Sequence, residues 1–330
     1  MAGLLISHAF NRQYGDRLTA VERELGLDIA RIVMPEDADD RVPQGDLERA
    51  TLAFFSGDIY PSHSRQFFAA AQGAANLEWM HIFPAGSDFP LFQGFLQRGI
   101  RLTNSSGASA MPIAQSAIGG LLALSRGFPH WLDAQRRKAW EPLTDEDVPA
   151  DLSTQTMVVI GVGAIGREVC RLGQALGLHI IGVRRSPRND DDPVDEMHTP
   201  SALPELYPRA DWLAIAAPLT DETKGLVDAA ALDLLPKGAA VLNVGRGAII
   251  DEAALTARLE SGTLSGAYLD VFEEEPLPQS SKLWQLPNVI ISPHNSAASR
   301  GNAARVTEIF FENYRRWQRG EPLVNEVLAG

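Results

Sequence analysis

The stretch VVIGVGAIG, in the middle of the 330-residue chain, constrains the fold more than any other part of the sequence. An apolar run ends there in the pattern G-x-G-x-x-G, and a helical pattern follows it. Gly161 permits a tight turn, Gly163 permits close approach of the backbone to a pyrophosphate, and Gly166 permits the helix to pack on the strand. The N–H groups of Ala164 and Ile165 would then face the phosphates. This context favours a dinucleotide site over a glycine-rich turn without a ligand.

The end of the next predicted strand indicates which dinucleotide is bound. An NAD-preferring site usually has an acid about 20 residues after the glycines, where it accepts a hydrogen bond from the ribose 2′-hydroxyl. Arg184 stands there instead, followed by Arg185 and Ser186. A guanidinium cannot accept from a hydroxyl, but it pairs well with a phosphate. These residues predict a preference for NADP(H), with NAD(H) and a solvated basic loop as the alternatives.

Length, charge and cysteine content narrow the class of protein. A chain of 330 residues favours two domains. The formal net charge of −13 argues against a nucleic-acid partner, which needs a basic face. The single cysteine, Cys170, excludes an internal disulfide and fits a reducing compartment. A buried structural thiol is favoured for it over a nucleophile.

We also expect a cytoplasmic protein without a membrane partner. The first residues, MAGLLISHAF, lack the basic and long apolar regions of a signal peptide and are typical of a strand. The longest apolar run, near residues 117–124, is too short to cross a bilayer.

Short apolar strands alternate with helical patterns in two series. The first runs from Gly3 to Ile100, and the second, with six predicted strands, starts at Thr156. A long helix from about Met111 to Arg126 separates them, followed by an exposed linker at 142–149. Alternation of this kind predicts α/β folds with parallel sheets that are doubly wound. The strands predicted in the second series are 157–160, 179–183, 212–215, 240–243, 266–269 and 289–291.

Three later stretches place chemistry-bearing residues at strand ends, where open α/β sheets bind ligands. VLNVGRG holds Arg246 between two glycines, LDVFEEEPLP contains Asp270 and Glu275, and ISPHNSA contains His294. An arginine can polarise a carbonyl, and an imidazole can transfer a proton. A neighbouring carboxylate stabilises the protonated imidazole. This set suits hydride transfer to a carbonyl, and none of the motifs predicts a metal site.

The motifs follow one another in the order and spacing of a known family. GVGAIG, APLTDETKGLV, LPKGAAVLNVGRGAIIDEAAL, LDVFEEEPLP and SPHNSA resemble the D-isomer-specific 2-hydroxyacid dehydrogenases. That family contains glyoxylate/hydroxypyruvate reductases and phosphoglycerate dehydrogenase. FPAGSDF, TNSSGASAMPIA and GEPLVNEV are further matches, so the resemblance covers nearly the whole chain.

The resemblance implies a catalytic triad of Arg246, Glu275 and His294. The arginine would hold the carboxylate and the carbonyl of the substrate, the histidine would exchange the proton, and the glutamate would orient the histidine. Because three glutamates are consecutive and alternate residues of an extended segment share a side, Glu273 is the second choice and Glu274 the least favoured.

The resemblance also assigns binding residues. The backbone N–H groups of Ala85, Gly86 and Ser87 would hold the substrate carboxylate. Asp270 would hydrogen-bond the nicotinamide carboxamide, and Pro218 would line the adenosine pocket.

The resemblance implies a Rossmann-type coenzyme domain, residues 103–297, inserted into a flavodoxin-like substrate domain. The substrate domain would consist of residues 1–102 and 298–330, with the active site in the cleft between the domains. The long helix after Met111 would form an arm that joins two coenzyme domains, which predicts a homodimer.

We therefore expect an NADP(H)-dependent reductase that converts a small 2-oxo acid, of the glyoxylate or hydroxypyruvate type, to the D-2-hydroxy acid. The alternatives are an NAD(H)-preferring dehydrogenase of the same family and a dinucleotide-sensing binding protein without catalysis. Gln115 and Ser116 stand where relatives commonly have an acid followed by His or Tyr, and Asn295 stands where a branched apolar residue is common. The sequence does not choose among 2-oxo acids.

Overall fold

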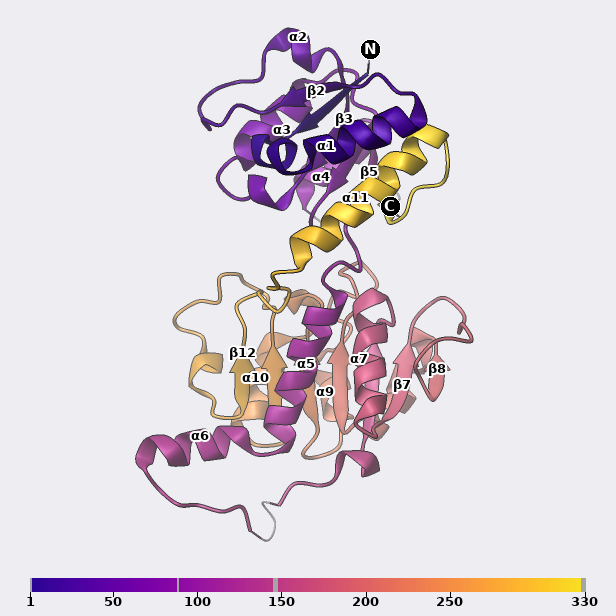
Figure 1. The fold of residues 1–330 in the computed structure, drawn as a ribbon. Coiled ribbons are helices and arrows are strands. Elements are labelled where there is room, and N and C mark those ends of the chain that lie inside the picture. The colour runs from indigo at the N-terminus through magenta and orange to yellow at the C-terminus, as the bar shows by residue number, and fades with distance from the viewer. Residues whose placement is uncertain (1, 88, 145–147, 328–330) are drawn as a thin grey trace. The chain divides into compact units, whose positions relative to one another are not determined.

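The structure is a computed structural model that describes residues 2–87, 89–144 and 148–327. The chain forms two compact units, in which residues close in space are drawn from distant parts of the sequence (Figure 1). Met1–Ala108 and Arg300–Gly330 make up the first unit, and Ser109–Ser299 makes up the second. Residues 145–147 of the predicted linker lie outside the described part of the chain.

The first unit continues to Ala108, and the second begins at Ser109. The reason is local hydrogen bonding, since residues 104–108 are bonded to the C-terminal segment. The N–H of Asn104 donates to the Asn325 carbonyl at 3.1 Å, and the Arg305 side chain donates to the Ala108 carbonyl.

The first unit contains a six-stranded sheet in the order β13-β5-β4-β3-β1-β2. Five of these strands are parallel and have the flavodoxin-like order 2-1-3-4-5, while β13 runs antiparallel to β5. The strands are β1 (Gly3–Ile6), β2 (Ala30–Val33), β3 (Ala50–Phe55), β4 (Trp79–Ile82), β5 (Arg101–Thr103) and β13 (Glu326–Val327).

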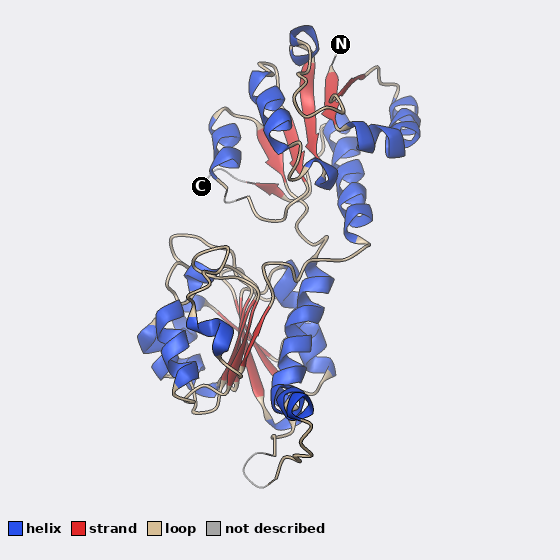
Figure 2. Cartoon of the chain, turned by 90° about the vertical axis from the view of Figure 1, so that its left-hand side faces the viewer, coloured by secondary structure: helices blue, strands red, loops and turns tan. Residues whose placement is uncertain are grey.

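Helices cover both faces of this sheet (Figure 2). Neighbouring residues of a strand point to opposite faces, so Phe54 and Phe55 belong to different cores. Phe54 stacks on Phe310 of the C-terminal helix, with ring centroids 4.2 Å apart, and Phe55 packs near Phe67 on the other face. The helices are α1 (His8–Leu25), α2 (Gln44–Leu47), α3 (Ser64–Gly73), α4 (Pro90–Gln97) and α11 (Asn302–Arg319).

The second unit contains a seven-stranded, wholly parallel sheet in the order β12-β11-β10-β9-β6-β7-β8. The prediction of two parallel-sheet α/β folds is confirmed. The strand β8 was not predicted, because its three residues, EMH, contain no apolar run. The strands are β6 (Thr156–Ile160), β7 (His179–Val183), β8 (Glu196–His198), β9 (Trp212–Ile215), β10 (Ala240–Asn243), β11 (Gly266–Leu269) and β12 (Val289–Ile291).

One face of the second sheet packs against α5 and α7, and the other against shorter helices. At Gly120 of α5 an added Cβ would lie 2.5 Å from the Tyr268 ring, so the helix lies close on the sheet. Cys170 of α7 is fully buried, and burial raises the pKa of its thiol to about 12, which fits a structural role. The helices are α5 (Ala110–Ser125), α6 (Phe128–Arg137), α7 (Ala164–Ala175), α8 (Leu203–Leu206), α9 (Ala229–Asp233) and α10 (Glu252–Glu260). No helix in the described part of the chain is both long and apolar enough to cross a membrane.

Candidate active site

The glycine turn between β6 and α7 uses its three glycines for three different reasons. Gly161 has a φ of +94°, and an added Cβ would lie 2.5 Å from Ala217 N. An added Cβ on Gly166 would lie 1.9 Å from the Gly161 carbonyl oxygen, so the helix packs directly on the turn. Around Gly163, by contrast, an added Cβ meets no described atom within 4 Å. The turn is therefore tight on its protein side and open at its middle glycine, as a phosphate cradle requires.

Pro218 follows β9 and is exposed. The preceding residue, Ala217, is the one that approaches Gly161, so Pro218 lies one residue from the glycine turn. Its carbonyl accepts a hydrogen bond from Thr223 Oγ1 at 2.7 Å.

The side chain of Arg184, at the end of β7, is enclosed by the protein. Its guanidinium donates to the carboxylate of Asp192 at 2.6 and 3.1 Å and to the Ser186 carbonyl at 3.2 Å. Only 12% of the Arg184 side chain is exposed. Asp192 also pairs with Arg167 of α7. The sequence singled out neither Asp192 nor Arg167, because an ion pair across an irregular loop leaves no periodic signal.

The ion pair is reflected in the titration of Asp192. Burial by itself would raise the pKa of this carboxyl. The hydrogen bond from the Asn189 N–H and the guanidinium groups of Arg184 and Arg167 nevertheless hold the pKa below its usual value. Asp192 is therefore ionised at neutral pH and balances part of the positive charge at the end of β7.

Arg185 is placed differently from Arg184. Its side chain is 75% exposed, and its guanidinium lies 3.6 Å from the equally exposed carboxylate of Glu222. An exposed pair of this kind contributes little to stability. Of the two arginines that the sequence indicates, Arg185 is thus the one accessible from solvent, and Ser186 beside it is exposed as well.

His294 and Glu275 form a short hydrogen bond in the second unit. The Nδ1 atom of His294 lies 2.6 Å from Glu275 Oε2, and Glu275 Oε1 accepts from the Phe272 N–H at 3.0 Å. With both carboxylate oxygens bonded, the imidazole is oriented through Nδ1. No described residue forms a hydrogen bond with its Nε2 atom.

The other two glutamates of the FEEEP segment do not contact the histidine. Glu273 Oε1 accepts from the Glu252 N–H at the start of α10, and the Glu273 N–H donates to Glu252 Oε2 at 3.0 Å. Glu274 is exposed. Among the three consecutive acids, Glu275 is therefore the one that the backbone turns toward His294.

Asp270 anchors the loop that carries His294. Its carboxylate is buried, and Oδ1 accepts from the N–H groups of Asn295 and Ser296 at 3.0 and 2.9 Å and from Ser292 Oγ at 2.6 Å. Its Oδ2 accepts from Ser296 Oγ. Both carboxylate oxygens of Asp270 are therefore bonded to the loop at residues 292–296, which carries His294.

Two of the atypical residues lie near the same loop. Asn295 contributes its backbone N–H to Asp270, a bond that does not depend on its side chain. Ser116 of α5 donates from Oγ to the Ser296 carbonyl at 3.3 Å, while Gln115 is exposed.

Arg246 follows β10 in a loop that packs backbone to backbone against the Phe272 segment. An added Cβ on Gly247 would lie 1.9 Å from the carbonyl carbon of Phe272, so no side chain fits there. The Arg246 Nη1 donates to the Gly245 carbonyl at 2.8 Å. Because Phe272 bonds the Glu275 carboxylate, the contact at Gly247 joins the Arg246 loop to the segment that holds Glu275.

The predicted substrate loop, Ala85 to Ser87, follows β4 in the first unit. Its Ala85 carbonyl accepts from Asn104 Nδ2 at 2.7 Å, and its Ser87 carbonyl accepts from Gln93 Nε2 at 3.0 Å. Among the described residues, none is recorded as accepting a hydrogen bond from the N–H of Ala85, Gly86 or Ser87. The loop therefore offers donors to an anion.

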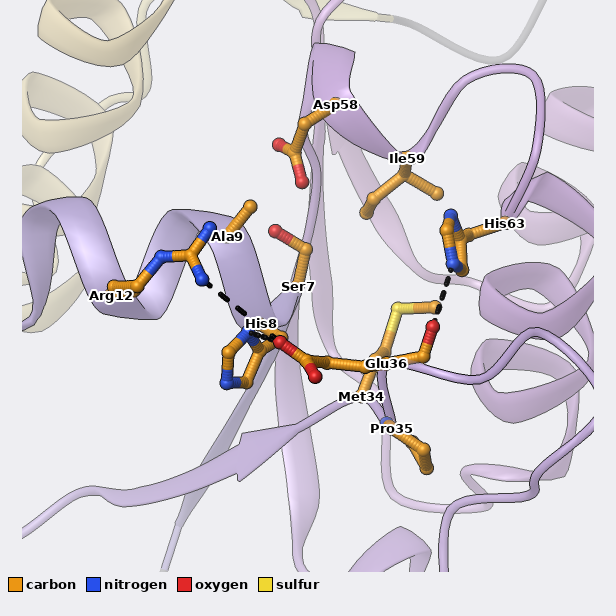
Figure 3. Close-up of a pocket in the computed structure, with 10 residues that line it drawn as sticks. All are labelled: Ser7, His8, Ala9, Arg12, Met34, Pro35, Glu36, Asp58, Ile59 and His63. Atoms are coloured by element: carbon orange, nitrogen blue, oxygen red, sulfur yellow. Dashed lines mark hydrogen bonds and ion pairs between the residues drawn. The ribbon is translucent and has the colours of Figure 1, made fainter.

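A cavity of about 310 Å³ lies elsewhere in the first unit, at the carboxyl ends of β1 and β2 (Figure 3). Glu36 interacts there with three neighbouring side chains. Glu36 contacts His8 at 2.9 Å and Arg12 at 4.0 Å, and its carbonyl bonds the His63 ring at 3.1 Å. None of the residues that the motifs indicate lines this cavity. Within the described ranges, no group of three His, Cys, Asp or Glu side chains could hold a metal ion.

Residues 118–296 match the family model of the D-isomer specific 2-hydroxyacid dehydrogenase NAD binding domain. A glyoxylate reductase from Aeropyrum pernix is 34% identical over 237 residues, which are 69% of this chain and 70% of that protein. A D-3-phosphoglycerate dehydrogenase from Methanocaldococcus jannaschii is 33% identical over 233 residues, 70% of this chain but only 44% of that protein.

A solved structure is also similar along the whole chain. It is the D-isomer specific 2-hydroxyacid dehydrogenase from Xanthobacter autotrophicus in complex with NADPH and MES. The two share 29% sequence identity with a TM-score of 0.78, and the match covers 99% of this chain and 98% of the other.

Proposed function

The chain belongs to the D-isomer-specific 2-hydroxyacid dehydrogenase family of NAD(P)-dependent enzymes, and we propose that it reduces a small 2-oxo acid to the D-2-hydroxy acid. The substrate class we propose is that of glyoxylate and hydroxypyruvate. The observation that carries this proposal is the bond of 2.6 Å between His294 and Glu275, in a loop that Asp270 anchors. A protein that only senses a dinucleotide does not need a histidine that a glutamate orients for proton transfer.

A bound dinucleotide is supported by the glycine turn. The helix α7 begins at Ala164, and the space around Gly163 is open to a pyrophosphate. When bound, the nicotinamide supplies the hydride. Pro218 lies beside the turn, where it would contact the adenosine, and Asp270 lies beside the loop where the carboxamide would be held.

In the proposed reaction, hydride addition to the carbonyl carbon turns the carbonyl oxygen into an alkoxide. Arg246 stabilises that negative charge and holds the substrate carboxylate. The Nε2 of protonated His294 then donates a proton to the alkoxide, so that the product carries one new C–H and one new O–H bond. Glu275 accepts the hydrogen bond of Nδ1–H and keeps the ring in the orientation that proton donation needs. The N–H groups of Ala85, Gly86 and Ser87 bind the same substrate carboxylate.

We propose that NADPH is preferred and that Arg185 and Ser186 bind its 2′-phosphate. This reassigns the main contact from Arg184, whose guanidinium is committed to Asp192. Arg184 supports the loop, and the exposed Arg185 provides the charge that a phosphate needs. The similar Xanthobacter autotrophicus protein binds NADPH, which supports this choice.

We further propose a cytoplasmic homodimer joined through α5 and α6. Large apolar side chains are exposed on and beside α6, which is unusual for a surface that stays in water. Trp131 is 41% exposed, Leu132 is 50% exposed and Trp140 is 97% exposed. A second copy of the same helix is the occupant we propose.

The experiment is a steady-state assay of the purified protein with glyoxylate, hydroxypyruvate and other 2-oxo acids, each with NADPH and with NADH. We expect turnover with a higher kcat/KM for NADPH. The variant His294→Ala should lower kcat by roughly 10²–10⁴ while NADPH binding, followed by coenzyme fluorescence, stays intact. Absence of turnover across the panel refutes the reductase and leaves a binding protein. Turnover that His294→Ala does not reduce refutes the role of the histidine.

A further inference from the structure

In the loop after β4, the carbonyl groups of Pro84, Ala85 and Ser87 accept hydrogen bonds, whereas no described residue accepts one from the N–H groups of residues 85–87. The Pro84 carbonyl accepts from the Ser105 N–H at 3.1 Å, and the Ala85 carbonyl accepts from Asn104 Nδ2 at 2.7 Å. Both donors come from the segment that follows β5, the neighbouring strand of the sheet. The loop is thus bonded through its carbonyl groups to the segment after β5. No described residue accepts a hydrogen bond from the N–H groups of residues 85–87.

These bonds determine where the N–H groups point. A trans peptide group is planar, so its carbonyl and its N–H point in opposite directions. The bond from Asn104 to the Ala85 carbonyl therefore sets the direction of the Gly86 N–H. The bond from Ser105 to the Pro84 carbonyl sets the direction of the Ala85 N–H in the same way. Donors that are already oriented need no reordering when an anion binds.

Asn104 is itself held on both sides. Its Oδ1 accepts from the Ser106 N–H at 3.0 Å, which fixes the amide and directs Nδ2 to Ala85. Its backbone N–H donates to the Asn325 carbonyl at 3.1 Å, and Asn325 Nδ2 donates to the Ser106 carbonyl at 2.8 Å. Asn325 has a φ of +56°, in the left-handed region that asparagine adopts more readily than most residues. The C-terminal segment thus holds Asn104 in place, and Asn104 in turn holds the Ala85 carbonyl of the loop.

We propose that Asn104 is a positioning residue, which acts through the Ala85–Gly86 peptide group to aim the Gly86 N–H at the carboxylate of the substrate. Asn325 is the anchor of Asn104. This inference rests on the proposed function, in which the loop binds a 2-oxo acid. In it, Asn104 and Asn325 act through the loop and not by contact with the substrate or the coenzyme.

The test is the variant Asn104→Asp, which keeps the oxygen that accepts from Ser106 and removes the donor to Ala85. A carboxylate oxygen would then face the Ala85 carbonyl and turn the peptide away. We expect the KM for glyoxylate to rise about tenfold or more, as the loss of an oriented hydrogen bond to a charged group predicts. The kcat at saturating glyoxylate should stay near the wild-type value, because Arg246, Glu275 and His294 are unchanged. The Kd for NADPH should stay near its wild-type value as well, because the glycine turn, Arg185 and Ser186 are unchanged.

The matched control is Asn76→Asp. Asn76 Nδ2 donates to the Glu48 carbonyl, also at 2.7 Å, but both residues precede their strands at the opposite edge of the same sheet. A purely structural effect should change the KM equally in both variants, and that result would overturn the inference. An unchanged KM in Asn104→Asp would overturn it as well.

A second measurement separates this inference from the proposed reaction. Isothermal titration of the protein with oxalate, a two-carbon dicarboxylate, measures anion binding without turnover. If the wild type binds oxalate and reduces no 2-oxo acid, the proposed function fails, and a weaker oxalate affinity in Asn104→Asp still supports the inference. A wild-type protein that binds no oxalate, or an affinity that Asn104→Asp leaves unchanged, refutes it.

Discussion

The buried histidine of the first sheet allows a quantitative prediction about stability and pH. His81 of β4 is fully buried, its Nδ1 lies 2.7 Å from Thr103 Oγ1 and its Nε2 lies 3.1 Å from Ser105 Oγ. Burial lowers the pKa of its imidazole to about 3. The ring is therefore neutral in the folded protein over the whole range in which the protein would be handled.

The unfolded chain behaves differently, because an exposed histidine has a pKa of about 6.5. Between pH 6.5 and pH 3 the unfolded state binds a proton that the folded state does not, so the free energy of unfolding falls as the pH falls. The slope is about 1.4 kcal/mol per pH unit, which amounts to roughly 2.7 kcal/mol between pH 7.5 and 4.5. Carboxyl groups with a lowered pKa, such as those of Glu308 and Glu326, reduce stability only at lower pH.

The assay is urea unfolding at several pH values between 7.5 and 4.5, followed by tryptophan fluorescence. Trp79 reports on this region, since its ring lies 6.4 Å from that of His81. We expect His81→Gln to flatten the slope and His63→Gln, at the edge of the cavity, to keep it. The ring resonances of His81 in an NMR titration give the same answer without a variant. A ring that titrates near pH 6.5 in the folded protein, or an unchanged slope in His81→Gln, refutes the reasoning.

Three further predictions concern the coenzyme, the Arg246 loop and the assembly. Arg185→Ala should lower kcat/KM for NADPH by about tenfold or more and leave kcat/KM for NADH unchanged. The control is Arg171→Ala, which removes an exposed arginine of α7 and should change neither value. Equal losses with both coenzymes would contradict the assignment of Arg185. Gly247→Ala forces the Phe272 backbone to move, so it should abolish most activity. It should also destabilise the protein by roughly 1–3 kcal/mol, measured by thermal unfolding. Full activity would show that the close approach of Gly247 to Phe272 is not needed. Trp140→Ser should shift sedimentation toward the monomer, and a wild type that sediments as a monomer excludes the dimer.

The parts of the molecule that the sequence predicts well are those with a local signal. The turn at Gly161 and the six strands expected from residue 156 onward are recognisable because apolar runs and glycines are close together in the chain. The strand β8 was missed because its residues are only partly buried and pair along one edge. A strand whose sequence shows no alternation gains its structure from its neighbour.

The contacts that the sequence does not reveal join distant or irregular segments. Asn104 and Asn325 are 221 residues apart, and no spacing rule relates them. Arg184 and Asp192 are only eight residues apart, but an irregular loop joins them, so the sequence pattern does not reveal that they form an ion pair. The choice of Glu275 among three acids likewise depends on how the backbone turns after β11, which the bond to Phe272 records.

The return of the chain to the first unit has a consequence for synthesis. The second unit is encoded continuously, whereas the first lacks α11 and β13 until residue 327 has been made. During translation, Phe54 and Trp79 lack the cover that Phe310 provides. Since domains fold as units while the chain emerges from the ribosome, the second unit has all its strands first. Arg246, Glu275 and His294 are thus made before the segment with Asn325 that bonds Asn104, so the hydrogen bonds that hold residues 104–106 are the last of these contacts to form.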